Sequence, residues 1–359
     1  MSRVPNLTPL RGIAALMIVV FHFYLWKSAV SHGFDWRHVA FIGKSYLAVD
    51  FFFLLSGYII AYVHARDLSG GIRWRAMADF LWARLARIYP LHLYVLLVLV
   101  AVLRRVDTDL VYNLLLLQAP WTDHPSWNVS AWSISAEWHA YLAFPVLVAV
   151  LYRRRPSIAI GAILGCAVVL VGLDAGFGTL DITNGAAVLL RAIPEFTIGM
   201  MIERVQAGGL LPAAGPLALP CAASAVAAAL AIGLPDASIV VLEAVLLCTA
   251  VTDGASFASC VLNWRPLVFL GDISYSVYID HQTVFSLAPA LARKLLPTGL
   301  GDTLAAGGGL PELLALLALV IGCAALTYRF IEVPARRRMR AWRWSGFAVH
   351  QPHHPSVPP

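Results

Sequence analysis

Long apolar stretches recur along the whole chain and limit its fold more than any other feature. A helix needs about 20 mostly apolar residues to cross the hydrocarbon core of a bilayer. A spanning segment must also satisfy its backbone polar groups internally, which favours helices. We therefore predict an all-α, polytopic integral membrane protein with about ten transmembrane helices. The candidate spans cover approximately residues 10–27, 43–64, 88–103, 132–152, 157–173, 185–202, 213–234, 237–252, 266–289 and 310–330.

Two segments depart from this pattern. Residues 110–118 are apolar but are only about half as long as a span, so we expect an interfacial or re-entrant segment there. Residues 333–359 are basic and then contain several Pro and His residues, a composition that buries no core. We therefore predict a transmembrane domain over residues 1–332 and a disordered cytoplasmic tail over residues 333–359.

The composition excludes several other classes of protein. Apolar residues make up 60% of the chain and charged residues 13%, which leaves too few polar groups to cover a water-soluble surface. The net charge of +6 is spread in short bursts between apolar runs and forms no basic face with interleaved aromatic residues, so we expect no nucleic-acid partner. The five cysteines form no CxxC pair, which argues against a metal site or a disulfide framework.

The distribution of Lys and Arg between the loops predicts the orientation, because positive charge concentrates on the cytoplasmic side. With a cytoplasmic N-terminus, 17 of the 26 basic residues fall on the inner side and seven on the outer side. Ten crossings then return the C-terminus to the cytoplasm. We predict a multi-pass protein of this topology, bound to membrane lipids.

Titratable groups inside the predicted spans indicate a polar, hydrated cavity. A charge near the bilayer centre costs at least ~2.5–3.5 kcal/mol on insertion scales, so each of these groups needs a partner or a function. The groups are Arg11, His22, Asp50, His92, Glu137, His139, Arg191, Glu195, Glu243, Asp272, Asp280 and His281.

The first span carries Arg11 and His22 on one helical face. Eleven residues are close to three turns, which separates the two side chains by roughly 16 Å along the axis. A buried histidine stays neutral and can accept a proton near neutral pH. The alternative from spacing alone is a packing histidine and an arginine that reaches the membrane surface.

Two further clusters lie at helical spacing. Arg84 and Arg87 are one turn apart at the cytoplasmic start of the third span, which suits a phosphate-bearing ligand. Positive-inside anchoring to lipid headgroups explains them equally well.

Ser133 and Glu137 share a face of the fourth span, where the carboxylate would orient a histidine or bind hydroxyl groups. An aromatic belt with a capping Glu is the competing interpretation.

Five segments, in order, resemble the membrane-bound acyltransferase-3 family, which includes bacterial polysaccharide O-acetyltransferases. The arginine–ten residues–histidine pattern of Arg11 and His22 is the most diagnostic match. Thr8, Pro9 and Ala48 depart from the residues common in the family, which leaves the substrate subtype open. The matching segments are residues 7–22, 49–57, 84–90, 132–145 and 267–281, with a weaker match at 332–336.

The resemblance implies an enzyme of the bacterial cytoplasmic (inner) membrane that uses no metal. It would move an acyl group, usually acetyl, from cytoplasmic acetyl-CoA or another acyl-CoA to a hydroxyl. The acceptor would be a glycan, a lipid-linked saccharide or a macrolide. His22 matches the family's catalytic histidine and Arg11 its paired arginine.

The other site residues follow from the same resemblance. Arg84 and Arg87 match the arginine pair that engages the donor, and we add Ser133 to the donor-binding set. Glu137 or Asp50 would position the imidazole or the acceptor, and Arg11 would stabilise an oxyanion or hold donor phosphate. The alternative class is a non-enzymatic transporter or glycan flippase, which the absence of an internal repeat weakens.

Overall fold

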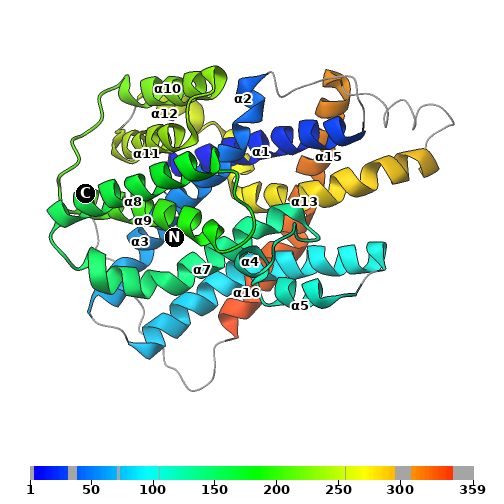
Figure 1. The fold of residues 1–359 in the computed structure, drawn as a ribbon, viewed down its shortest axis with the longest axis horizontal. Helices are drawn as coiled ribbons and strands as arrows, with labels where there is room; N and C mark the ends of the chain where they lie inside the picture. Colours follow the sequence, from blue (N-terminus) through cyan, green and yellow to red (C-terminus); the bar gives the residue numbers. More distant parts are fainter. Residues whose placement is uncertain are drawn as a thin grey trace.

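The computed structural model describes residues 4–30, 39–70, 73–104, 106–254, 256–295 and 309–342. The described chain is almost entirely helical, and its one β feature is an isolated bridge between Ala214 and Asp253. Figure 1 shows the long helices packed side by side in a single bundle. The long helices are α1 (Leu7–Val30), α3 (Ala48–Ser69), α4 (Trp74–Leu103), α7 (Trp132–Leu147), α8 (Pro156–Phe177), α9 (Ala187–Ala207), α10 (Ala218–Ile232), α11 (Asp236–Thr252), α13 (Arg265–Leu295) and α15 (Leu310–Thr327).

Short helical segments connect or extend these long helices. They are α2 (Ala40–Gly43), η2 (Ser45–Leu47), α5 (Thr108–Leu114), α6 (Gln118–Trp121), η3 (Val129–Ala131), η4 (Val148–Tyr152), α12 (Phe257–Leu262), η5 (Tyr328–Glu332) and α16 (Val333–Ala341).

Within the described residues, six helical segments are long and apolar enough to cross a membrane. Each of the ten long helices overlaps one predicted span, so the prediction of an all-helical membrane protein is confirmed. The number of about ten crossings stays a prediction, because four of these helices are shorter or more polar than a typical span. The six segments are Leu7–Ser28, Ala40–Leu68, Trp74–Leu103, Val129–Tyr152, Pro156–Phe177 and Leu310–Ala341.

The relative directions of the helices agree with alternating crossings. Helices α1 and α13, the first and ninth predicted spans, run in the same direction, and so do α3 and α9, the second and sixth. Helices α13 and α15, the ninth and tenth, run in opposite directions. The directions follow from the residue pairs Arg11–Ser274 and His22–His281, Asp50–Arg191 and Tyr58–Gln206, and Ser276–Glu332 and Asp280–Thr327.

Glycine pairs bring two of these helix pairs into backbone contact. A Cβ atom on Gly57 of α3 would lie 1.9 Å from the Phe196 carbonyl oxygen of α9, and one on Gly199 would lie 1.9 Å from the Leu54 carbonyl oxygen. Small residues at such crossings let membrane helices approach closely, since helix association in lipid depends on packing. Gly12 and Gly271 make the equivalent approach between α1 and α13.

Residues 110–118 fold back along α4 instead of crossing the bundle. The short helices α5 and α6 lie in this region, and α5 has only seven residues. Tyr89 of α4 donates to the Leu114 carbonyl (3.0 Å), and His92 Nε2 donates to the Asn113 carbonyl (2.9 Å). Tyr89 and His92 lie well inside α4, so this segment packs beside the middle of α4, and its interfacial or re-entrant position stays a prediction.

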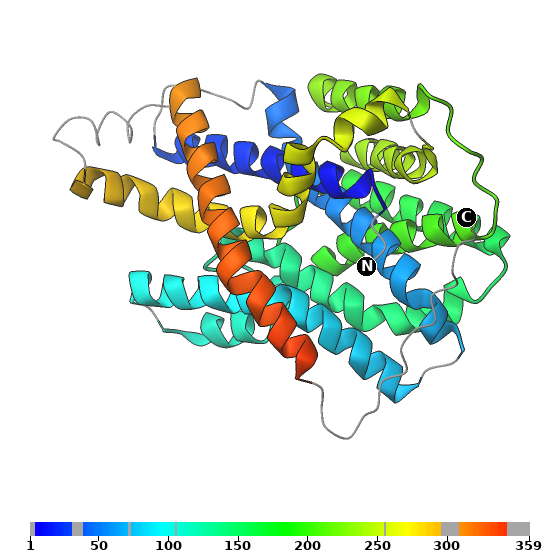
Figure 2. The same ribbon diagram turned by 180° about the vertical axis from the view of Figure 1, so that it is seen from behind.

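The prediction of disorder is wrong for the first part of the C-terminal tail. Residues Val333–Ala341 form α16, which continues from α15 through η5 and lies across α4 (Figure 2). The Trp82 indole of α4 donates to the Met339 carbonyl (2.7 Å), so the basic segment is anchored by packing that its composition does not reveal. Residues 343–359 lie outside the described part of the chain.

Candidate active site

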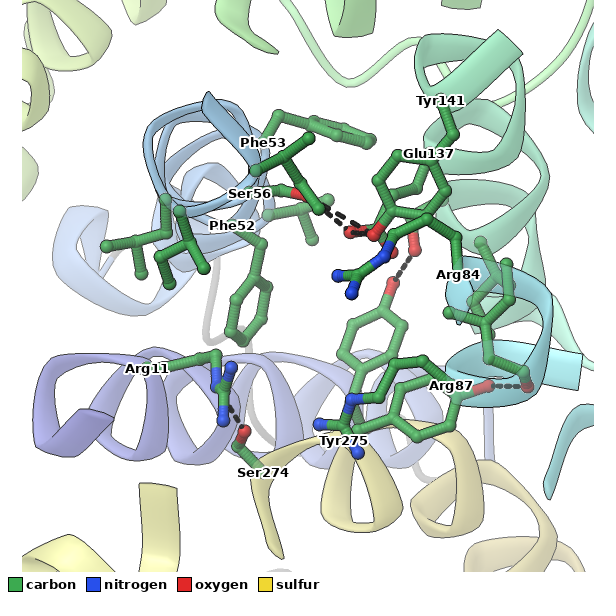
Figure 3. Close-up of a pocket in the computed structure, with 18 residues that line it drawn as sticks. Arg11, Phe52, Phe53, Ser56, Arg84, Arg87, Glu137, Tyr141, Ser274 and Tyr275 are labelled. Atoms are coloured by element: carbon green, nitrogen blue, oxygen red, sulfur yellow. Dashed lines mark hydrogen bonds between the residues drawn. The ribbon is translucent and has the colours of Figure 1, made fainter. Parts of the chain in front are cut away.

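A cavity lined by both polar and apolar side chains lies between α1, α3, α4, α7 and α13. It is lined by 18 residues and encloses about 830 Å³ of empty space, its open mouth included. Figure 3 shows three arginine side chains, Arg11, Arg84 and Arg87, directed into this space from two helices. The polar lining residues are Arg11, Ser56, Arg84, Arg87, Ser133, Glu137, Tyr141, Ser274, Tyr275 and Tyr278.

Arg11 is held at the cavity wall by neutral oxygen atoms. Its Nε donates to the Ser274 hydroxyl and its Nη2 to the Gly271 carbonyl, both at 2.9 Å. The close approach of α1 and α13 at Gly12 and Gly271 makes this reach possible. Its hydrogen bonds in the described structure go to neutral oxygens, and the carboxylates of Asp272 and Glu137 act on its charge electrostatically.

Arg84 is a buried cation that forms no ion pair in the described chain, although Glu137 acts on it electrostatically. Its residue is 8% exposed, its Nη2 donates to His64 Nε2 at 3.4 Å, and its Nε has no hydrogen-bond partner among the described residues. Removing a guanidinium from water without a counter-ion costs several kcal/mol. An anion in the cavity would offset that cost, and Arg84 is therefore the strongest sign of an anionic ligand.

Arg87, one turn further along α4, is already paired. It forms an ion pair with Glu332, and its guanidinium lies 5.4 Å from the centre of the Tyr275 ring. Glu332 also accepts from the Ser276 hydroxyl (2.9 Å) and pairs with Arg336 (3.4 Å). Arg84 and Arg87 thus line the same cavity, and within the described chain Arg87 forms an ion pair whereas Arg84 forms none.

Glu137 faces the cavity from α7 and is bound by two hydroxyl groups. The Ser56 hydroxyl donates to Glu137 Oε1 at 2.7 Å, and Tyr141, four residues along the same helix face, donates at 2.5 Å. Figure 3 shows Arg84 beside this group. Glu137 therefore belongs to the arginine end of the site and does not touch His22.

Ser133 connects the cavity to the buried histidines. Its hydroxyl hydrogen-bonds the Tyr278 hydroxyl (2.7 Å), and the Tyr278 hydroxyl donates to the Ser130 carbonyl (3.0 Å). Ser130 Oγ lies 3.3 Å from His281 Nε2. Because Tyr278 and Ser133 line the cavity and His22 does not, these two hydroxyl groups close its inner end.

His22 forms a pair with His281 beyond Tyr278. His22 Nδ1 lies 3.1 Å from the Ile18 carbonyl oxygen and 3.1 Å from His281 Nε2, whereas His281 Nδ1 lies 2.7 Å from the Tyr278 carbonyl oxygen. A carbonyl oxygen only accepts, so both Nδ1 atoms are assigned the hydrogen. His281 Nε2 then accepts from His22, and the lone pair of His22 lies on Nε2, as a proton acceptor requires.

Asp50 lies outside the cavity lining and is bound elsewhere. Both of its carboxylate oxygens accept from Arg191 of α9, at 2.8 and 2.6 Å, and both residues are 0% exposed. The Arg191 guanidinium also lies 5.0 Å from the centre of the Trp132 ring. This placement does not support the prediction that Asp50 positions the imidazole or the acceptor; Asp50 joins α3 to α9.

The structure thus brings Arg11, Arg84, Arg87, Ser133 and Glu137 together in the cavity lining. His22 lies outside this lining, next to His281. Sequence reasoning overlooked Ser56 and His64. These residues lie eight positions apart on α3, a spacing that puts both on one helical face.

The bundle of apolar helices around an arginine-lined cavity defines an all-helical membrane protein. The acyltransferase domain of the acyltransferase-3 family matches residues 5–329, so the chain belongs to this family of membrane acyltransferases. Within the described residues, no group of three or more His, Cys, Asp or Glu side chains is arranged to hold a metal ion.

Three relatives cover 93% of this chain. The acyltransferase MdmB of Streptomyces mycarofaciens is 27% identical, with 92% of its own length covered. The peptidoglycan O-acetyltransferase OatA of Listeria monocytogenes is 22% identical, and the putative peptidoglycan O-acetyltransferase YrhL of Bacillus subtilis is 24% identical. The chain spans 56% and 55% of these two proteins. No solved structure matches the chain.

Proposed function

We propose that the protein transfers an acyl group, most simply acetyl, from acyl-CoA to a hydroxyl group of a sugar-containing acceptor. The observation that carries the proposal is the buried Arg84 guanidinium, which faces the cavity and forms no ion pair in the described chain. A phosphate group would supply the missing negative charge and accept its hydrogen bonds. The O-acetyltransferase names of two relatives support the acetyl group and a glycan acceptor.

In this proposal the donor enters the cavity at its arginine end. Its phosphates bind Arg84 and Arg87, and the flexible pantetheine arm carries the thioester past Glu137 toward Ser133 and Tyr278. Arg11 holds donor phosphate or stabilises the oxyanion that forms at the thioester carbonyl.

The acceptor hydroxyl reacts at His22. His22 Nε2 removes the hydroxyl proton while the oxygen attacks the thioester carbonyl carbon. The carbon–sulfur bond then breaks, and the leaving thiolate takes the proton from the imidazolium, which restores neutral His22 and releases the free thiol. Tyr278 must move aside for donor and acceptor to meet, because it closes the inner end of the cavity.

A covalent acyl-histidine intermediate is the rival mechanism for the same site. In that case His22 Nε2 attacks the thioester first, and the acceptor hydroxyl attacks the acyl-imidazole in a second step. Rapid-quench mass spectrometry of the protein with acetyl-CoA and no acceptor distinguishes the two routes. Direct transfer predicts an unmodified His22, whereas the rival predicts one acetyl group on it.

The proposal is tested with the protein in nanodiscs, by measuring the binding of acetyl-CoA and the transfer of acetyl to a glycan. Saturable binding of acetyl-CoA, together with an acetyl unit gained by a glycan fraction, supports an acyltransferase. A transporter or flippase has no reason to bind acetyl-CoA, so a wild-type protein that is folded but does not bind it would overturn the proposal.

A further inference from the structure

Helix α16 lies antiparallel to the start of α4 and in a defined register. Trp82 of α4 contacts Met339, and Arg87 pairs with Glu332. These two pairs place Arg336 at the level of Arg84. Arg340 lies one turn further along α16, toward the N-terminal end of α4. Figure 2 shows this overlap of α16 (red) with α4 (cyan).

Two of the four arginines of α16, Arg336 and Arg340, add positive charge next to the cavity. Arg336 is half-buried and Arg340 is exposed, and both lie within electrostatic range of Arg84. Arg340 also acts electrostatically on His64, the neutral residue that accepts from Arg84. Arg337 and Arg338, next to them in sequence, are exposed.

Too few carboxylates balance this cluster. Three guanidinium groups line the cavity and two more on α16 act on Arg84 from beside it, and Glu332 is the carboxylate shared by Arg87 and Arg336. Glu137 is the carboxylate of the cavity lining, where hydroxyl groups occupy its Oε1. Asp272 also acts electrostatically on Arg11, so three carboxylates face five cations. Two positive charges remain in excess among these groups, and bringing them together is unfavourable unless a polyanion binds. The five cations are Arg11, Arg84, Arg87, Arg336 and Arg340.

We infer that Arg336 and Arg340 of α16 form an outer phosphate subsite, which begins at the level of Arg84 and extends one turn of helix beyond the inner subsite there. The inference rests on the proposed function and specifies its donor class: a thioester that carries two separated phosphate groups, as a nucleotide such as CoA does. The inner arginines bind the pyrophosphate, and the α16 pair binds the phosphomonoester on the ribose. A donor with one phosphate would leave the outer pair empty.

The test compares acetyl-CoA with 3′-dephospho-acetyl-CoA, in nanodiscs of zwitterionic lipid. We expect wild type to bind the dephospho donor at least about tenfold more weakly, the loss of one charge-assisted contact. The variant Arg336→Ala/Arg340→Ala should bind the two donors with affinities that differ by no more than about twofold. The matched control Arg337→Ala/Arg338→Ala should keep the wild-type discrimination.

The single variant Arg340→Ala guards against misfolding, because Arg336 also contacts Glu332 whereas Arg340 is exposed. It should lose most of the discrimination while its unfolding midpoint stays at the wild-type value. If the double variant still discriminates like wild type, the inference is wrong.

Anionic lipid headgroups offer the same phosphate chemistry, and the test separates them. If α16 binds lipid, its variants lose affinity equally for both donors, and only in nanodiscs that contain anionic lipid; that result overturns the inference. Failure of the proposed function looks different, because wild type itself would then bind neither donor.

Discussion

Arg84 connects stability to function at the level of a single residue. Its charge is buried and forms no ion pair among the described residues, so folding bears a desolvation cost that a bound phosphate offsets. Residues that serve a ligand at the expense of stability are common at functional sites. The phosphate interpretation of Arg84 therefore makes two linked predictions.

For Arg84→Met we expect weaker donor binding and an unfolding midpoint no lower than wild type. Loss of a charge-assisted contact should raise the apparent KM for acetyl-CoA at least about tenfold. Removal of the buried charge should leave the thermal midpoint unchanged or higher. Both values are measured in the same detergent preparation. A midpoint that falls with an unchanged KM would identify Arg84 as a structural residue.

Asp50 and Arg191 show the opposite behaviour, because each is the ion-pair and hydrogen-bond partner of the other. For Asp50→Asn we expect destabilisation of about 3–5 kcal/mol, because an unpaired guanidinium is left in the core. The double variant Asp50→Asn/Arg191→Met should recover most of that loss, and denaturant titrations of the four proteins give the coupling energy. Additive losses would contradict the pairing.

At the scale of elements, glycine contacts fix how α3 meets α9. We expect Gly57→Ala to destabilise the protein by at least about 1–3 kcal/mol, since a Cβ there would overlap the α9 backbone. Gly161→Ala on α8 is the matched control, because a Cβ there meets no atom within 4 Å. Thermal unfolding of both variants gives the comparison, and equal midpoints would refute the close crossing.

Hydropathy predicted the long helices because burial in lipid or protein requires apolar residues over a whole segment. It missed α16, a mostly basic helix that packs on α4 through the contacts of Trp82 with Met339 and Trp342. A docked basic helix and a solvated basic tail have the same composition. The sequence alone therefore could not distinguish them.

Spacing predicted which site residues share a helical face, such as Arg84 with Arg87 and Ser133 with Glu137. It could not predict which helices face each other. Asp50 finds its partner 141 residues away, and Tyr278, far along the chain, separates His22 from the arginine cavity. Such pairings depend on helix packing, which a single sequence does not record.

At the scale of the whole molecule, the paired helix directions predict the topology. If α4 begins in the cytoplasm, Asp123 before α7 lies outside the cell and Arg154 before α8 lies inside. In a chain whose five native cysteines are replaced, we expect Asp123→Cys to react with an impermeant maleimide in intact cells. Arg154→Cys should react only after the membrane is opened. The reverse pattern would invert the orientation.

The whole assembly places arginines at one end, the His22–His281 pair deeper in the bundle and Tyr278 between them. We propose that this arrangement lets a cytoplasmic donor react with an acceptor from the other side. The central claim is that His22 Nε2 takes the acceptor proton.

The most direct test is transfer of labelled acetyl from acetyl-CoA to glycan in inside-out membrane vesicles, for wild type and His22→Ala. Wild type should label the glycan fraction, and His22→Ala should lose at least about 100-fold of the rate, within the range of general-base catalysis, while it still binds acetyl-CoA. A folded His22→Ala protein that transfers acetyl at the wild-type rate would contradict the account.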